Sequence, residues 1–224
     1  FCAYELMRQK PDMKVLMIEK GRSIEKRQCP KRTTKVCVGC KPCSITTGFA
    51  GAGAFSDGKL SLSPDVGGTL PEILGYEKAE ELIKEADNIY LKFGADEKVY
   101  GIDDYEAIER IRAEAIRANL KLIECPIRHL GTEEGYKIYT RLQEHLLASG
   151  VEIKFMTMVQ DIIIEDGVAK GVVTDKEETY YADEIVSGIG REGSSWFEGI
   201  CKNHGIKTQN GTVDVGVRVE VRDE

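Results

Sequence analysis

The sequence predicts a mixed α/β domain with a central parallel sheet, a β-meander and a helical insertion. Three observations predict this fold class. A short apolar run at residues 13–18 follows a helical pattern, amphipathic helical patterns occupy residues 71–150, and short strand patterns separated by turns occupy residues 151–224. A helix that leads into a buried strand is half of a βαβ unit, from which parallel sheets are built.

The first elements are a helix in "FCAYELMRQK" and a strand in the apolar run of "MKVLMIEKG". Such a short run is typical of a parallel strand buried on both faces. The helical pattern has no N-cap residue, and no strand and turn come before it. We therefore expect a piece of a longer domain that lacks its first strand and turn. An open sheet position would then favour a homo-oligomer.

Residues 20–70 contain no helical pattern, and a loop of that length within a compact domain is usually functional. Its central stretch is "SITTGFAGAGAFSDGKL", residues 44–60. Glycines lack a β-carbon, so backbone N–H groups there can approach a pyrophosphate or a flavin ring. A free surface loop is the alternative, but it would not alternate apolar residues with glycines. The residues expected to contact a ligand are Gly48, Gly51, Gly53, Ser56, Asp57 and Lys59.

Three amphipathic patterns predict helices in the middle of the chain, and we interpret all three as packing elements. The first begins near Ala79 and keeps its apolar residues on one face. The second follows a capping box formed by Asp103 and Glu106. The third covers residues 135–147 and ends with Gly150 as its C-cap.

Strand patterns follow these helices. "NLKLIECPIRHLG" predicts a strand that runs into a loop at Pro126, and "VEIKF" predicts a second strand. The stretch that begins "MVQDIIIEDGVAKGVVTD" reads as short strands separated by turns, with "EDG" as a hairpin signal. "ADEIVSGIGREGSSWF" predicts a strand that ends at Gly188 and Gly190, and then a helix that starts near Ser194.

Glu19 and His129 are single residues with a chemical interpretation. A carboxylate at the carboxyl end of a buried strand can accept hydrogen bonds from both hydroxyls of a ribose, and the alternative is an ordinary exposed glutamate. The glycine-rich turn that completes this fingerprint would fall before Phe1. His129 follows a loop-forming proline and suits acid–base chemistry, but a structural histidine is the more common case.

Four of the seven cysteines lie close together, at Cys29, Cys37, Cys40 and Cys43. Their two-residue gaps suit a tetrahedral metal or an iron–sulfur cluster. A redox or structural thiol group is the alternative, because the fourth cysteine followed by proline of a ferredoxin run is missing. Both interpretations stay open, and we assign no metal ligand. The uneven spacing argues against a secreted disulfide framework and predicts a reducing, cytoplasmic setting.

The composition limits the class of partner. The formal net charge is −7, and the sequence has no basic run of the kind that nucleic acids or anionic membranes need. No stretch approaches the roughly 20 apolar residues that span a bilayer. We therefore expect neither a nucleic acid nor a membrane as a partner, and a small molecule as the substrate.

Taken in order, these pieces resemble FAD-dependent oxidoreductases of the glutathione-reductase-like superfamily, which have a Rossmann-like FAD-binding domain. A closer resemblance is to a group described as uncharacterised FAD-dependent dehydrogenases. It rests on "CKPCSITTGFAGAGAFSDGKLSLSPDVGG", "IYLKFGA", "PIRHLGT" and "GIGREGSSWF" and covers almost the whole chain. The resemblance implies that the cofactor FAD contacts Glu19, Lys20, Gly48, Gly51, Gly53, Ser56, Asp57, Gly58, Lys59, Val159, Gly188 and Gly190.

In this resemblance the chain is one partial FAD-binding domain in three portions. Residues 1–70 would hold the dinucleotide and flavin, residues 71–150 are mostly helical, and residues 151–224 return as strands. NAD(P)H is an expected electron donor. The family continues into a substrate-facing portion beyond this chain, so no catalytic residue is assigned. Two alternatives remain, a metal-binding module built on the four cysteines and an RNA-modifying flavoprotein, and the net charge of −7 argues against the second.

Overall fold

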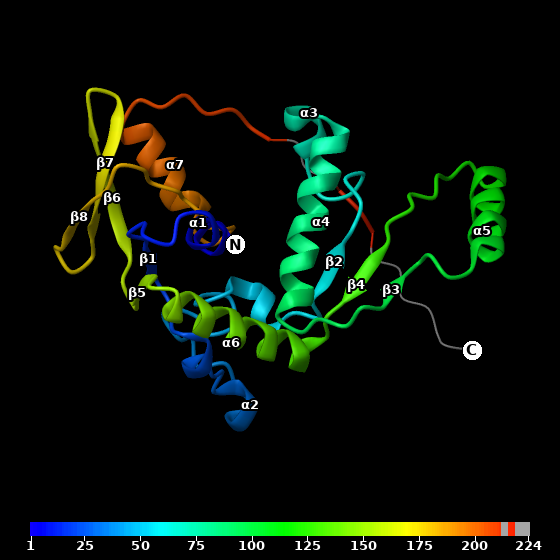
Figure 1. The fold of residues 1–224 in the computed structure, drawn as a ribbon, viewed down its shortest axis with the longest axis horizontal. Helices are drawn as coiled ribbons and strands as arrows, with labels where there is room; N and C mark the ends of the chain where they lie inside the picture. Colours follow the sequence, from blue (N-terminus) through cyan, green and yellow to red (C-terminus); the bar gives the residue numbers. More distant parts are fainter. Residues whose placement is uncertain (212–214, 218–224) are drawn as a thin grey trace. The chain divides into compact units, whose positions relative to one another are not determined.

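The computed structural model describes residues 1–211 and 215–217, in two compact units (Figure 1). The first unit is Phe1–Val159 with Thr174–Glu177, and the second is Gln160–Val173 with Glu178–Glu224. The elements up to the boundary at Val159 are α1 (Cys2–Gln9), β1 (Leu16–Glu19), η1 (Ile24–Lys26), α2 (Lys31–Thr34), η2 (Gly51–Phe55), β2 (Lys59–Ser61), α3 (Leu70–Leu74), α4 (Tyr76–Lys92), β3 (Val99–Tyr100), α5 (Tyr105–Arg117), β4 (Ile127–His129), α6 (Thr132–Ala148) and β5 (Glu152–Phe155). The later ones are β6 (Val159–Glu165), β7 (Val168–Thr174), β8 (Thr179–Tyr181) and α7 (Ser194–Asn203).

The predicted parallel sheet is confirmed by the pairing of β1 with β5. Leu16 pairs with Glu152, and Glu19 pairs with Phe155, so the carboxyl ends of both strands lie at the same edge. The prediction that the first strand is buried on both faces is wrong. Leu16 is 37% exposed, because β5 is the only strand paired with β1 in the part of the chain that the structure describes.

The core of the first unit lies where α1, α4 and α6 meet the β1–β5 sheet. Burial of apolar side chains from these elements stabilises the unit, at roughly 25 cal/mol per Å² of apolar surface. The tightly buried members of this cluster are Ala3, Tyr4, Met7, Ile24, Phe49, Ala54, Phe93, Leu130, Ile138, Tyr139, Leu142, Leu146 and Val151. Phe49 and Ala54 belong to the glycine-rich stretch, so that stretch is packed into the core and is not a free loop.

Helix α6 leads directly into β5 through the glycine that the sequence predicted. Gly150 has a φ of +91°. Its N–H donates to the carbonyl of Leu147 at 3.1 Å, and the N–H of Val151 donates to the carbonyl of Leu146 at 3.0 Å. These two bonds form a Schellman motif, in which a left-handed glycine lets the chain turn back over the helix end.

The predicted capping box of α5 is wrong by one residue. Asp104 caps the helix, because its Oδ1 accepts the N–H of Ala107 at 2.9 Å. A capping side chain reaches the N–H three residues ahead, and Asp103 is not in that position for a helix that begins at Tyr105. No residue of α5 is buried in the described structure.

A second sheet has the order β2-β4-β3, with both pairs antiparallel. The strand expected before Pro126 is wrong, since β4 starts after it at Ile127. Proline has no N–H to give to a ladder, and the carbonyl of Pro126 instead accepts the N–H of Leu62 at 2.8 Å. Lys59 pairs with His129 in this sheet, which places two residues of the sequence analysis side by side.

The second unit contains the predicted meander, with strand order β6-β7-β8. Asp166 and Gly167, with φ of +50° and +76°, connect β6 to β7, as expected for an Asp-Gly hairpin turn. The strand predicted up to Gly188 is wrong. The described residues there form no ladder and Val186 is 72% exposed, because an apolar run without a partner strand cannot form a sheet. Helix α7 starts at Ser194, as predicted.

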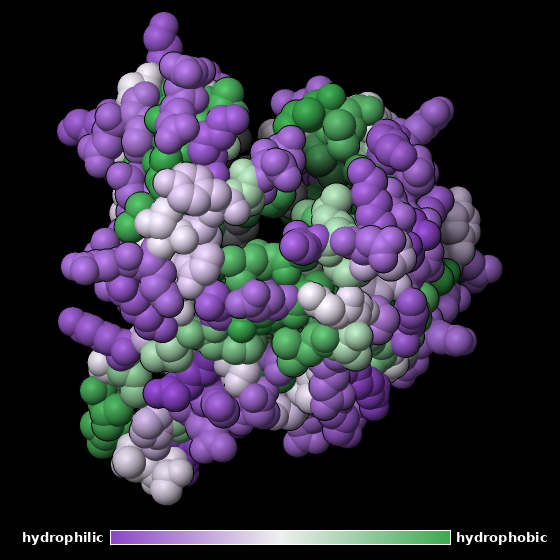
Figure 2. Space-filling view, turned by 60° about the vertical axis from the view of Figure 1, so that its left-hand side comes forward, coloured by the Kyte–Doolittle hydropathy of each residue, from purple (hydrophilic) through white to green (hydrophobic). Residues whose placement is uncertain are grey.

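Apolar side chains also reach the surface. Ile73 and Leu74 of α3 are 74% and 44% exposed, and Tyr76 at the start of α4 is 51% exposed. Figure 2 shows patches of hydrophobic surface between hydrophilic side chains on one face. No described helix is long and apolar enough to cross a membrane.

Candidate functional site

The candidate site lies at the carboxyl ends of β1 and β5, where the glycine-rich stretch of residues 44–60 crosses the end of the sheet. The N–H of Phe49 donates to the carbonyl of Arg22 at 3.0 Å, and Arg22 forms a parallel bridge with Gly48. The N–H of Met156, just after β5, donates to the carbonyl of Gly21 at 2.8 Å. Ligands of open α/β sheets bind at such carboxyl ends.

Glu19 ends β1 and is half-buried. Its Oε1 accepts the N–H of Gly21 at 2.7 Å, which orients the carboxylate at the strand end. One carboxylate has about four acceptor positions, so this single bond leaves it able to accept hydroxyl donors as well. Lys20 follows in the chain and is half-buried.

Arg27 organises the stretch, and the sequence analysis did not identify it. The side chain is only 3% exposed. Its guanidinium donates to the carbonyls of Phe49 at 2.5 Å, Gly51 and Ile45 at 2.7 Å each, and Ser44 at 3.0 Å. Burial lowers the pKa of Arg27, and the negative charge of Glu19 and Cys43 partly opposes that effect. No local pattern marks Arg27, because all four acceptors come from a later segment.

The glycines differ in what occupies the space of a β-carbon. At Gly48 the side chain of Arg27 and the carbonyl of Arg22 lie within 2.6–2.7 Å, and at Gly58 the Cβ of Leu130 lies at 2.9 Å. At these two positions the chain itself fills the space. Gly53 faces the hydroxyl of Tyr139 at 3.3 Å. Only at Gly51 does the space stay open among these four, in a left-handed conformation with φ of +56°.

A bulky cofactor needs open space beside the backbone and free acceptors near it. The open space at Gly51 lets backbone approach a ligand, and the Glu19 carboxylate keeps free acceptor capacity. At Gly48 and Gly58 a β-carbon would overlap other atoms of the same chain, so glycine is required there without any ligand. Glu19 and Gly51 therefore leave acceptor capacity and open space at this edge, whereas the space beside Gly48, Gly53 and Gly58 is occupied by the chain itself.

Gly21 is a second residue that the sequence analysis missed, although a glycine two residues after a strand end is a recognisable signal. A β-carbon on Gly21 would lie 2.5 Å from the N of Gly48 and 2.6 Å from its Cα. The backbone of the glycine-rich stretch therefore approaches the end of β1 as closely as two backbones can.

Replacing Gly21 by alanine is expected to destabilise the protein by about 1–3 kcal/mol, because the new methyl group overlaps backbone that cannot rotate away. Gly135→Ala is the matched control. A β-carbon at Gly135 meets no atom within 4 Å, and alanine in a helix interior is expected to add about 0.5–1 kcal/mol. Urea denaturation of both variants checks this prediction, and equal stability of the two would contradict it.

Asp57, Lys59 and His129 form a charged group where residues 44–60 join β2. His129 Nε2 lies 2.8 Å from Asp57 Oδ1, and Lys59 Nζ lies 3.2 Å from Asp57 Oδ2. Hydrogen bonds from His129 and then Lys59 lower the pKa of the Asp57 carboxyl. All three side chains are at least one-third exposed. Ser56 uses its hydroxyl locally, donating to the carbonyl of Gly53 at 3.1 Å.

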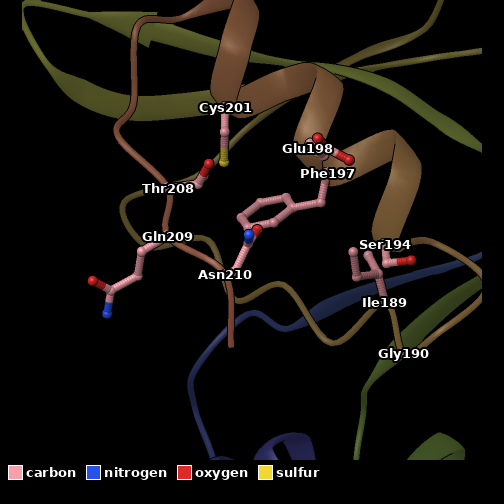
Figure 3. Close-up of a pocket in the computed structure, with 9 residues that line it drawn as sticks. All are labelled: Ile189, Gly190, Ser194, Phe197, Glu198, Cys201, Thr208, Gln209 and Asn210. Atoms are coloured by element: carbon pink, nitrogen blue, oxygen red, sulfur yellow. The ribbon is translucent and has the colours of Figure 1, made fainter. Parts of the chain in front are cut away.

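The remaining predicted residues belong to other elements of the chain. Val159 begins β6 and is half-buried. Gly188 and Gly190 belong to the second unit, where a β-carbon at either would meet open space. Gly190 has a φ of +62° and borders a cleft of about 390 Å³ beside α7 (Figure 3). Phe197, Glu198, Cys201 and Asn210 also line this cleft.

The seven cysteines are free thiols, and Cys201 is buried. Among the described residues, no three side chains of His, Cys, Asp or Glu are arranged to hold a metal ion. Cys43 is exposed and lies at a turn. Hydrogen bonds from the N–H groups of Thr46 and Ile45 lower the pKa of its thiol, with a smaller contribution from the charge of Arg27.

Residues 105–224 match the family model described as pyridine nucleotide-disulphide oxidoreductase. No curated protein matches the chain. The matched segment runs from α5 to the end of the chain and includes β4, β5 and the whole meander.

Proposed function

The chain belongs to the pyridine nucleotide-disulphide oxidoreductase family, and we propose that it forms part of the FAD-binding domain of an FAD-dependent dehydrogenase. NAD(P)H is the proposed electron donor, and a small molecule is the proposed substrate. The fold supports this proposal, because a parallel sheet with helices and a meander is consistent with a Rossmann-like FAD-binding domain.

The observation that supports the proposal most is the position of Glu19. Its carboxylate is held at the carboxyl end of a parallel strand by the N–H of Gly21, directly beside the tightly packed glycine-rich stretch. An acidic residue at this point of an α/β sheet binds the hydroxyls of an adenosine ribose. In the proposed complex Glu19 therefore binds the ribose, and the open backbone at Gly51 allows the cofactor to approach.

When bound, FAD supplies two-electron hydride chemistry, which no amino-acid side chain can perform. The protein's own residues bind and orient. Arg27 fixes the carbonyls of residues 44–51, so that the N–H groups of this stretch keep one arrangement. Lys59 brings positive charge to the end of the stretch, where it would favour a negatively charged reduced flavin.

The first experiment is a visible absorption spectrum of the purified protein, followed by titration with FAD. We expect two resolved flavin bands and release of intact FAD on denaturation. A protein that takes up no FAD would overturn the proposal, whatever its oligomeric state.

Replacing Glu19 by glutamine is expected to weaken FAD binding about tenfold, because a charged hydrogen bond is roughly twice as strong as a neutral one. Glutamine keeps an oxygen for the N–H of Gly21, so the fold is retained. Glu77→Gln on the exposed first turn of α4 is the control and should leave the affinity unchanged. Fluorescence titration of the three proteins measures the effect, and equal affinities would exclude the ribose role of Glu19.

A further inference from the structure

The pairing of β2 with β4 holds the end of the glycine-rich stretch against His129. The N–H of Leu130 donates to the carbonyl of Gly58 at 2.8 Å, and the N–H of Gly131 donates to the carbonyl of Asp57 at 3.0 Å. The antiparallel ladder thus continues past Lys59 to Asp57. This backbone pairing fixes the Asp57 carboxylate beside the imidazole, independently of the side-chain contact.

The side-chain contact orients the ring. Asp57 Oδ1 lies 2.8 Å from His129 Nε2, and the other ring nitrogen, Nδ1, has no hydrogen-bond partner among the described residues. The side chain of His129 is 36% exposed, so a small molecule can reach the imidazole. A carboxylate on one nitrogen of an imidazole stabilises the positive charge that arises when the other nitrogen takes a proton.

The other charged groups around His129 leave this pairing intact. Lys59 Nζ bonds to the second oxygen of Asp57. On the neighbouring strand, the ring of Tyr100 lies 6.4 Å from the imidazole, with Lys98 over that ring at 4.5 Å. Arg128 is adjacent in sequence, but its charge is neutralised by Asp87 through two bonds of 2.5 and 2.7 Å.

From this geometry we infer that His129 accepts a proton from the substrate in the dehydrogenase reaction and that Asp57 positions its ring. This inference rests on the proposed function. The step is a proton transfer: an O–H or N–H bond of the substrate breaks, its electron pair stays on the substrate atom, and the proton bonds to Nδ1 of His129. The substrate class proposed with this step is a small alcohol or amine, whose heteroatom-bound hydrogen is the proton that His129 takes.

The second unit contains a matched control. His204 Nε2 lies 3.0 Å from Asp161 Oδ1, and the side chain of His204 is 24% exposed. This pair has the same chemistry as His129–Asp57, but neither of its residues belongs to the glycine-rich stretch, whereas Asp57 does. The third histidine, His145, packs against the rings of Tyr4 and Phe93.

The first test is chemical modification of the histidines by diethyl pyrocarbonate, with and without saturating FAD, followed by peptide mass spectrometry. We expect FAD to slow modification of His129 about tenfold or more and to leave His204 unchanged. Flavin binding without protection of His129 relative to His204 would overturn the inference and leave the proposed function standing. Absence of flavin binding would overturn both.

The second test measures proton uptake. The midpoint potential of the bound flavin is recorded against pH for the wild type, His129→Gln, Asp57→Asn and His204→Gln. A proton acceptor near the cofactor takes up a proton when the flavin is reduced. We therefore expect His129→Gln to take up one proton fewer on reduction, as read from the slope of midpoint potential against pH. Asp57→Asn should shift the pH range in which that proton is taken up. His204→Gln should match the wild type. Identical curves for all four proteins would overturn the inference.

Discussion

Replacement of Arg27 by methionine is expected to lower the free energy of unfolding by about 3–5 kcal/mol. Methionine keeps an apolar stem like that of arginine, but it is shorter and has no donor. The carbonyls of Ser44, Ile45, Phe49 and Gly51 then lose the guanidinium that satisfies them. Each buried acceptor without a donor costs about 1–3 kcal/mol, and water reaching the partly exposed carbonyls of this set reduces the total.

Arg32→Met is the control for this experiment. Both guanidinium groups lie over the ring of Phe55, Arg27 at 4.8 Å and Arg32 at 5.4 Å. Arg32 is exposed, so its loss should change stability by no more than about 0.5 kcal/mol. Urea denaturation compares the variants, and limited proteolysis within residues 44–51 locates the damage. Equal losses for both would show that stacking on Phe55, and not the carbonyl bonds, is what Arg27 contributes.

Replacement of Asp87 by alanine is expected to cost about 3–5 kcal/mol, the usual penalty for leaving one buried charge of an ion pair without its partner. Arg128 is 4% exposed and forms a two-bond contact with Asp87 from α4. It also donates to the carbonyl of Asp96 at 2.6 Å. An arginine side chain keeps its proton in proteins, so the charge of Arg128 cannot be lost to relieve the strain in the variant.

The double variant Asp87→Leu with Arg128→Met separates the contribution of the ion pair to stability from that of the other contacts of Arg128. Apolar residues of similar volume replace a buried ion pair at little cost, so we expect this protein to be more stable than Asp87→Ala alone. Thermal and urea denaturation measure the difference. A double variant as unstable as the single one would mean that the contact of Arg128 with the carbonyl of Asp96, and not the ion pair with Asp87, is what stabilises this part of the unit.

The elements predicted correctly are those specified by local chemistry. Gly150 ends α6 in a left-handed turn, and Asp166-Gly167 connects two strands of the meander. The wrong strands, before Pro126 and before Gly188, are apolar runs whose fate depends on whether another strand is in reach. That information is not local.

In the candidate site, too, the features set by local sequence were predicted and those set by contacts between distant segments were not. The sequence marked Glu19, and it marked Asp57 and His129 separately without indicating that they meet. It did not indicate that the side chain of Arg27 fills the space beside Gly48. Arg27, Gly21 and the Asp57–His129 pair act through contacts between distant segments, which residue types and spacing do not reveal.

The pairing of β1 with β5 has a consequence for synthesis of the protein. Leu16 finds its partner only at Glu152, and a ribosome adds about 5–20 residues per second. During synthesis β1 is therefore without its partner strand for on the order of ten seconds before β5 has been made. During that time β1 is an apolar segment without a neighbour, which makes it a natural binding site for a chaperone on the nascent chain.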